Sequence, residues 1–208
     1  MKKIGVIDYG AANIENVVRA VRFLDKDVEL ISDPNQMANC SHLILPGVGA
    51  FPFGLAMLAE KGFVESLRGE AQRGKPVLGI CLGMQLLFEQ SEEFEVVRGL
   101  ALFEGYVKSL GADFERGNNR IPRIGWYPVT ANNDTFQDNF FGKWNNQYFY
   151  FAHSYYVKPT QSASHLVTLF GSNPICAGYK IENLIGVQFH PEKSGKIGLS
   201  FLDSFFEI

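Results

Sequence analysis

Apolar residues follow two different spacings through the first 80 residues of the chain. Short runs rich in β-branched residues predict four buried strands, over residues 3–8, 28–31, 42–45 and 76–80. Between these runs, apolar residues recur at helical spacing and predict helices over residues 14–24, 53–60 and 63–73, with Asn13 as the cap of the first. Strands that alternate with helices favour a parallel sheet with helices on both faces, which binds ligands at the carboxyl ends of its strands.

The pattern changes in the second half of the chain. Five segments predict strands separated by turn-rich stretches, over residues 101–110, 125–130, 148–157, 166–169 and 186–189. Residues 111–119 are polar and predict a mobile loop, whereas residues 195–206 place apolar side chains on one face of a final helix. No linker, repeat or low-complexity tract divides the chain. We therefore expect one α/β domain over residues 1–208, with a central, mostly parallel sheet flanked by helices.

Composition and charge argue against several classes of protein. The 208 residues are 46% apolar, which is enough for a core without disulfides. The net charge is −3 and no Lys/Arg run occurs, so we expect no nucleic-acid partner. The first apolar stretch ends at Asp8, and no later segment approaches the ~20 apolar residues that span a bilayer. Three widely spaced cysteines without a Cys-x-x-Cys pair predict free thiols, no structural metal and a cytoplasmic location.

The strongest catalytic motif is Gly79-Ile80-Cys81-Leu82-Gly83, where the fourth strand meets a helix. This G-x-C-x-G pattern is the thiol counterpart of the nucleophile elbow, in which small neighbours leave room for a tight turn. The N-terminus of the following helix favours a thiolate on Cys81. An isolated cysteine is usually a small core residue, and we interpret Cys40 and Cys176 in that way. The strand, the two glycines and the helix indicate instead that Cys81 is a nucleophile.

A catalytic thiol needs a base, and four histidines compete for that role. His42 begins an apolar strand and His165 follows a serine-rich turn, so structural or surface roles are expected for both. Pro191 biases His190 toward extended backbone, and in an extended chain Glu192 lies on the same face as His190. This arrangement gives an imidazole and a carboxylate that orients it, as nucleophilic catalysis requires. His153 is the main rival as base, but it lacks a carboxylate two residues away.

Together these motifs resemble the class I, or triad, glutamine amidotransferases, which combine a Cys elbow with a late His-Pro-Glu. Within that superfamily, the turn Pro46-Gly47-Val48-Gly49-Ala50-Phe51 is similar to that of the glutaminase subunits of imidazole glycerol phosphate synthase. Similar blocks run from residue 4 to residue 197, so the resemblance covers essentially the whole chain. The resemblance implies a flavodoxin-like, three-layer fold.

The family implies a role for each candidate residue. Cys81 would attack the side-chain amide of glutamine, and His190, oriented by Glu192, would protonate the leaving ammonia. The backbone N–H of Leu82 and the turn formed by Gly47, Val48 and Gly49 would stabilise the negative oxygen of the tetrahedral intermediates, the turn by a peptide rotation that the partner induces. By similarity, the amino-acid end of glutamine would contact Gln85, Glu93, His153, Ser154 and Tyr155. The alternatives are a solvated helix end for Glu93 and a core position for Tyr155.

Ammonia must reach its acceptor without meeting bulk water, where it would be protonated. The chain has no P-loop and no dinucleotide-binding G-x-G-x-x-G, which predicts a glutaminase without a cofactor that serves a separate synthase. The resemblance implies that this synthase is a (β/α)8 barrel cyclase of histidine biosynthesis, which adds ammonia to a ribulosyl aminoimidazole carboxamide nucleotide. It also implies that Asn13 and Asn16 lie at the interface, where the alternatives are a helix cap and an exposed polar residue.

Two segments depart from the pattern of these glutaminase subunits. Ala12 occupies a position where glycine is usual, and Pro122-Arg123-Ile124-Gly125-Trp126-Tyr127 lacks the usual His-Met before Gly-Trp and Asn after it. Both departures could alter partner docking. They leave open a second pathway, in which a paralogous glutaminase supplies ammonia for amidation of a nucleotide-activated sugar in surface-polysaccharide biosynthesis.

Two further classes of function compete with a glutaminase subunit. A Cys-elbow esterase or peptidase would act alone, but Gln85, residues 46–49 and the His-Pro-Glu motif favour a glutaminase. A non-catalytic binding subunit would have lost its chemistry, and drift commonly removes one catalytic residue once selection lapses. Retention of Cys81, His190 and Glu192 argues against that second class.

Overall fold

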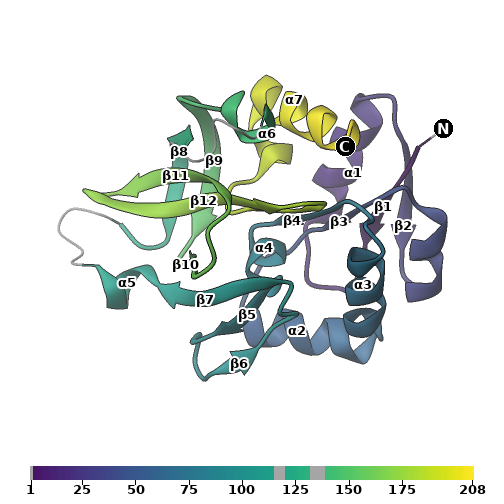
Figure 1. Ribbon diagram of the computed structural model, residues 1–208, viewed down its shortest axis with the longest axis horizontal. Coiled ribbons are helices and arrows are strands. Elements are labelled where there is room, and N and C mark those ends of the chain that lie inside the picture. Colours follow the sequence, from purple (N-terminus) through teal and green to yellow (C-terminus); the bar gives the residue numbers. More distant parts are fainter. Residues whose placement is uncertain (1, 115–119, 132–138) are drawn as a thin grey trace.

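The computed structural model describes residues 2–114, 120–131 and 139–208, and its centre is a nine-stranded sheet (Figure 1). In order across the sheet, the strands are β2 (Asp27–Ile31), β1 (Lys3–Ile7), β3 (His42–Leu45), β4 (Val77–Ile80), β13 (Leu184–Val187), β12 (Asn173–Ile181), β11 (Ser164–Phe170), β8 (Arg123–Ala131) and β9 (Gln147–His153). The first five are parallel and follow the 2-1-3-4-5 order of flavodoxin-like folds. The other four extend the sheet by antiparallel pairing.

Helices cover both faces of the parallel half, which confirms the predicted α/β class (Figure 1). One face carries α1 (Ile14–Phe23) and α7 (Gly195–Phe206), and the other carries α2 (Phe51–Glu60) and α3 (Phe63–Gln72). Successive side chains of a strand point to opposite faces, so Ile4 and Val6 pack with α1 and α7, whereas Ile7 packs with α2 and α3. Within the described ranges, every helix is too short or too polar to traverse a lipid bilayer.

A second, four-stranded sheet lies beside the first, below it in Figure 1. Its strands in order are β10 (Tyr155–Pro159), β7 (Phe103–Ser109), β5 (Phe88–Ser91) and β6 (Val97–Arg98). The single strand predicted over residues 148–157 is therefore wrong, because β9 ends in the large sheet and β10 belongs to the small one. The chain changes sheets at Ser154. The hydrophobic pattern continues without interruption across this point, so spacing alone does not reveal the change of partner strand.

Several short elements complete the chain. They are η1 (Pro34–Asn39), α4 (Leu82–Leu86), α5 (Leu110–Asp113), α6 (Asn139–Gly142) and η3 (Pro191–Lys193). The predicted loop 111–119 begins with α5, and its residues 115–119 lie outside the described residues. The predicted side-chain cap of α1 is wrong, because the side chain of Asn13 makes no capping hydrogen bond.

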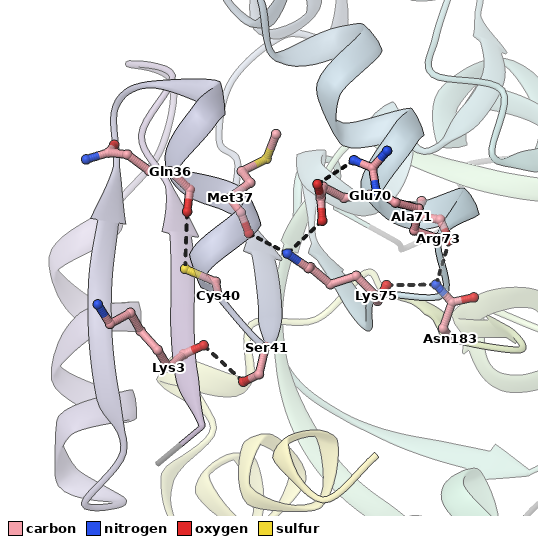
Figure 2. A network of polar contacts seen from close by, with 10 residues as sticks. All are labelled: Lys3, Gln36, Met37, Cys40, Ser41, Glu70, Ala71, Arg73, Lys75 and Asn183. Atoms are coloured by element: carbon pink, nitrogen blue, oxygen red, sulfur yellow. Dashed lines mark hydrogen bonds and ion pairs between the residues drawn. The ribbon is translucent and has the colours of Figure 1, made fainter.

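Polar side chains connect the amino ends of the parallel strands (Figure 2). Lys75, which precedes β4, forms an ion pair with Glu70 of α3 at 2.6 Å and donates to the carbonyl of Met37 in η1. Asn183, which precedes β13, donates to the carbonyl oxygens of Lys75 and Ala71 at 2.7 and 3.0 Å. These contacts fasten the edge of the sheet opposite to the one that carries Cys81.

Candidate active site

Cys81 lies at the carboxyl end of β4, where the chain turns into α4. Its backbone has a φ of +54° and a ψ of −109°, a conformation that residues with a side chain rarely adopt and that costs about 1–3 kcal/mol. The N–H of Cys81 donates to the carbonyl of Val187 at 2.8 Å, which fastens the strained turn to β13. A turn of this shape presents the side chain at the edge of the sheet, as in a nucleophile elbow.

The two glycines of the elbow are required by close backbone packing. A Cβ on Gly83 would lie 1.8 Å from the carbonyl oxygen of Leu45, which neither backbone can accommodate. A Cβ on Gly79 would lie 2.7 Å from the carbonyl oxygen of Gly83. The G-x-C-x-G spacing therefore follows from the fit of α4 against β3 and β4.

His190 and Glu192 form an ordered pair next to this turn. Nδ1 of His190 lies 2.8 Å from Oε1 of Glu192, and both side chains are almost completely buried. His190 has the extended backbone expected before proline, but Glu192 lies in the 3-10 helix η3. The predicted extended chain through Glu192 is therefore wrong. The tight turn itself returns the carboxylate to the imidazole, because consecutive residues of a 3-10 helix stay close together.

The charge state of His190 follows from its neighbours. Burial alone disfavours a charged imidazole, but hydrogen bonds to Cys81 and Glu192 outweigh it and raise the pKa of His190 to about 10. His190 is thus an imidazolium at neutral pH, and an imidazolium stabilises negative charge on the neighbouring sulfur. The pair can supply a proton to a leaving group on the substrate.

Gln188 completes the contacts of the sulfur, and it was not among the residues predicted from the sequence. Its Nε2 lies 3.7 Å from Sγ of Cys81, and its Oε1 accepts a hydrogen bond from Nε2 of Gln85 at 3.0 Å. Gln188 is fully buried, so the amide is fixed by these two contacts. One signal was available in the sequence: Gln188 is a polar residue in an otherwise apolar run directly before His190.

His153, the rival base, is held differently. Its Nδ1 lies 2.7 Å from the carbonyl oxygen of Tyr155, and burial lowers the pKa of His153 to about 3. The ring is therefore neutral at physiological pH, with Nδ1 as the donor and Nε2 as the free acceptor. It has no carboxylate contact comparable to that of His190 among the described residues, so His153 is the weaker candidate for a catalytic base.

The glycine-rich turn adopts a resting conformation. The N–H of Val48 donates to the carbonyl oxygen of Ala11 at 2.9 Å, so this N–H is occupied and cannot hold an oxyanion. Gly47 is closely packed, since a Cβ built on it would lie 2.9 Å from the backbone nitrogen of Gly83. Gly49 has a φ of +99°, and no atom lies within 4 Å of a Cβ built on it. The turn thus has a conformation that glycine favours, with open space beside Gly49.

A pocket of about 370 Å³ brings most of the predicted residues together. Cys81, His190 and His153 line it, and so do other predicted contacts, namely Val48, Gly49, Leu82, Gln85, Glu93, Ser154 and Tyr155. Gly47 and Glu192 do not line the pocket; Gly47 precedes the lining residue Val48, and Glu192 contacts the lining residue His190. Because Ala152 and Tyr155 both line it, the pocket lies where the two sheets meet at Ser154. Asn13 and Asn16 are not part of the lining.

Glu93 is buried, so the alternative of a solvated helix end is wrong. It follows β5, and its Oε2 accepts a hydrogen bond from the N–H of Phe51 at 2.7 Å. Burial outweighs that hydrogen bond and raises the pKa of Glu93. Among the described residues no cationic side chain pairs with this carboxylate, which suits it to an ammonium group brought by a ligand.

Apolar side chains are exposed close to the mouth of the pocket. Ile124 and Trp126 of β8 are 57% and 50% exposed, and Tyr148 of β9 is 57% exposed. Ile124 and Trp126 follow Pro122, which lines the pocket, and Tyr148 lies on the adjacent strand β9. On α1, Asn13 is exposed and Asn16 is partly buried. These side chains form a candidate contact surface around the site.

A larger cavity of about 1030 Å³ lies between β8, β11 and β12 of the large sheet and β10 of the small one, and it shares no lining residue with the Cys81 pocket. Arg123, in the segment that departs from the family pattern, lines it and is buried, with Nη2 donating to Oγ1 of Thr168 at 2.9 Å. Its lining includes Cys176, whose pKa burial raises to about 12, so this thiol stays protonated. The described residues that line this cavity include no arrangement comparable to the Cys81–His190 pair.

Sequence comparison agrees with the geometry. The family description "Glutamine amidotransferase class-I" matches residues 5–207. The imidazole glycerol phosphate synthase subunit HisH of Caldanaerobacter subterraneus is 42% identical, over 99% of this chain and 98% of that protein. Subunit HisH 1 of Legionella pneumophila is 38% identical over the full length of both. The subunit HisH of Lactiplantibacillus plantarum is 40% identical over 98% of this chain and 94% of that protein.

Solved structures agree on the fold. A structure of PurLQS from Thermotoga maritima matches 99% of this chain and 98% of its own, with a TM-score of 0.73 at 21% identity. A crystal structure of a glutamine amidotransferase matches 98% of both chains, with a TM-score of 0.72 at 14% identity. The chain therefore belongs to the class I glutamine amidotransferases and, within them, to the glutaminase subunits, termed HisH, of imidazole glycerol phosphate synthase.

Proposed function

We propose that Cys81, His190 and Glu192 hydrolyse L-glutamine through a covalent thioester, and that the chain delivers the ammonia to a cyclase subunit. The observation that carries the proposal is the convergence of Cys81 and the imidazole of His190 on one pocket, with Oε1 of Glu192 2.8 Å from Nδ1 of His190. The full-length similarity to HisH subunits favours histidine biosynthesis over the sugar-amidating pathway.

The first half of the reaction forms the thioester. Sγ of Cys81 attacks the side-chain carbonyl carbon of glutamine, and the carbonyl oxygen becomes negative. His190 then gives its proton to the amide nitrogen as the C–N bond breaks, so ammonia leaves and the acyl group stays on sulfur. Glu192 keeps the imidazole oriented and stabilises its positive charge.

The second half releases glutamate. Neutral His190 takes a proton from water while the water oxygen attacks the thioester carbon, and the C–S bond then breaks. Both halves pass through a negative oxygen, which needs donors in place. The N–H of Leu82, at the start of α4, has no acceptor within its own helix and supplies one. The N–H of Val48 supplies the second once the Gly47–Val48 peptide rotates away from Ala11.

Glu93 and the strand change at Ser154 account for the choice of substrate. The buried carboxylate of Glu93 pairs with the α-ammonium group of glutamine, which gives this otherwise costly carboxylate a counter-charge. Ser154 lies between β9, which ends at His153, and β10, which begins at Tyr155, and backbone groups around this junction orient the α-carboxylate. Gln85 acts through Gln188, with which it shares a hydrogen bond.

The partner is a separate cyclase subunit with a (β/α)8 barrel that docks over the mouth of the pocket. The exposed apolar side chains of Ile124, Trp126 and Tyr148 supply the apolar part of this surface, and Asn13 and Asn16 supply polar contacts. Docking there covers the pocket, so ammonia passes into the partner without meeting bulk water.

Residues 1–208 act as one glutaminase domain in the cytoplasm. One cluster of buried side chains includes residues of both sheets, from Ile7 of β1 to Val157 of β10, which supports a single core. All three cysteines are free thiols, as is usual in a reducing compartment.

Cys81→Ala tests the proposal in the complex with the cyclase subunit. We expect glutamine-dependent synthesis of imidazole glycerol phosphate to fall by at least ~10⁴-fold, because no thioester can form. Synthesis from added ammonium should stay at the wild-type rate, because that chemistry lies in the partner. The products are measured by chromatography with either nitrogen donor.

Cys176→Ala is the matched control, since it removes a buried thiol that does not line the pocket of Cys81. It should keep activity with both nitrogen donors. Appreciable turnover of glutamine by Cys81→Ala would disprove the thioester mechanism. Loss of the ammonium-dependent reaction in the same variant would disprove the division of labour between the subunits.

A further inference from the structure

Tyr9 carries a hydroxyl group with no apparent role in the folded chain. Its side chain is fully buried, yet its hydroxyl has no hydrogen-bond partner. Buried hydroxyl groups almost always have a partner, because an unpaired one is costly. A group of this kind invites the question of which conformation would satisfy it.

The hydroxyl lies against the glycine-rich turn. A Cβ built on Gly47 would be 2.5 Å from Oη of Tyr9, so the phenol lies directly beside the α-carbon of Gly47, to which the Gly47–Val48 peptide is attached. Tyr9 comes from the same β1–α1 connection as Ala11, whose carbonyl oxygen holds the N–H of Val48 at 2.9 Å. Tyr9 is absent from the described residues that line the pocket, so it lies beneath the turn and away from the substrate.

Rotation of the Gly47–Val48 peptide changes the requirements at this position. Rotation exchanges the directions of the N–H and the C=O, so the carbonyl oxygen of Gly47 turns toward that of Ala11. Two acceptors then face each other in a buried position with no N–H between them, which is unfavourable without a donor. The hydroxyl of Tyr9 is a free donor at that place, and hydroxyl groups rotate to suit an acceptor.

We propose that Tyr9 is a positioning residue for the active conformation. After the peptide rotates, the hydroxyl of Tyr9 donates to one of the two carbonyl oxygens, of Gly47 and Ala11, that then face each other without an N–H between them. The Val48–Ala11 hydrogen bond stabilises the resting turn, and the Tyr9 hydrogen bond stabilises the rotated turn. The balance between the two conformations is thus set by two neighbouring residues of one connection. This inference rests on the peptide rotation of the proposed function.

The electrostatic setting keeps the phenol in the form that donates. Burial, together with the nearby Cys81, raises the pKa of Tyr9. The hydroxyl therefore retains its proton throughout the pH range in which the enzyme would work.

Tyr9→Phe tests this inference, because it removes the hydroxyl and keeps the ring. Glutaminase turnover is measured for the complex with its cyclase partner, with and without the acceptor nucleotide, and the ratio of the two rates is the stimulation. We expect the stimulation to fall by about five- to tenfold, the effect of one net hydrogen bond. The melting temperature should stay the same or rise, because the resting conformation loses only an unpaired group.

Tyr179→Phe is the matched control. Tyr179 is equally buried, but its hydroxyl donates to the carbonyl of Gln161 at 2.8 Å. This variant should melt at a lower temperature and keep its stimulation. If Tyr9→Phe keeps the wild-type stimulation, or lowers both rates in proportion, the positioning role is refuted. If the wild-type complex itself shows no stimulation, the peptide rotation of the proposed function is refuted, and the role of Tyr9, which depends on that rotation, is refuted with it.

Discussion

Gln188 uses both ends of its amide at the centre of the site. One end faces the sulfur of Cys81, and the other accepts from Gln85, which also donates to the carbonyl of Tyr155 at 3.2 Å. A side chain held in this way cannot turn its oxygen toward the sulfur without breaking the contact with Gln85. The amide N–H is therefore directed at Sγ, where it stabilises negative charge.

Gln188→Met removes this N–H at similar volume. We expect iodoacetamide to alkylate Cys81 about tenfold more slowly at pH 7, because a hydrogen bond to a charged group contributes ~1.5–3 kcal/mol. Labelled peptides identified by mass spectrometry report the rate at Cys81 alone. A Gln188→Met variant with the wild-type alkylation rate and a lower melting temperature would show that Gln188 only fills the core.

At the residue scale, the candidate residues that could be predicted from the sequence are those whose immediate neighbours form a recognisable motif. Cys81 is marked by its glycines, and His190 is marked by the proline and carboxylate that follow it. Gln188 and the Val48–Ala11 hydrogen bond depend on contacts between segments more than 30 residues apart along the sequence. Such contacts leave no local spacing in the sequence, so a single sequence does not reveal them.

The clearest stabilising device between elements is the polar network at the amino ends of the parallel strands. Glu70 of α3 accepts from Arg73 at 2.5 Å and pairs with Lys75 at 2.6 Å (Figure 2). Burial alone would raise the pKa of the Glu70 carboxyl, but the two cations outweigh it and lower that pKa below its usual value. The carboxylate therefore stabilises the fold above about pH 4.5, and this contribution is lost as the pH falls further.

Glu70→Gln should lower the free energy of unfolding by about 1–2 kcal/mol at pH 7, because it leaves Lys75 without its counter-charge. The difference from the wild type should shrink at acidic pH, as the pH falls through the lowered pKa of Glu70 and the wild-type carboxylate becomes protonated. Urea unfolding at several pH values measures both effects. Glu65→Gln on the same helix is the control, since the Glu65–Arg68 pair is largely exposed and contributes little. A constant difference across the pH range would contradict the role of the Glu70 charge.

The parallel half of the fold was predictable element by element, and the antiparallel half was less so. Buried parallel strands are mostly apolar, and β3 and β4, which are buried at every residue, stand out from their neighbours in the sequence. Strand β12 contains Pro174 and Gly178, which interrupt its apolar pattern, and it was not predicted. The short strands β5 and β6 were not predicted either. Their pairing partners, not their own composition, make them strands.

The whole molecule presents its catalytic pocket beside an uncovered apolar surface on β8 and β9. In the resting turn the N–H of Val48 is bound to Ala11, so one of the two proposed oxyanion donors is occupied. We expect the isolated subunit to hydrolyse glutamine about 10²–10³-fold more slowly than the complex with the acceptor nucleotide bound. Glutamate release by both forms measures the ratio. Vigorous activity of the isolated subunit would contradict the gating.

Trp126→Asp tests where the partner docks. The charge should weaken association and reduce the stimulated rate, while the rate of the isolated subunit should stay unchanged. Phe23→Asp is the control, because Phe23 is equally apolar and 73% exposed, but it ends α1 far from the pocket. Equal effects of both variants would exclude a docking surface around Trp126.

The positive φ of Cys81 has a consequence for the evolution of the enzyme. Glycine is the residue best suited to such dihedral angles. A mutation from cysteine to glycine would therefore remove the backbone strain at this turn and raise the melting temperature of the protein. The same change would end its chemistry. Laboratory evolution toward thermal endurance alone would thus drift toward an inert variant, and only selection for growth without supplied histidine would hold the thiol in place.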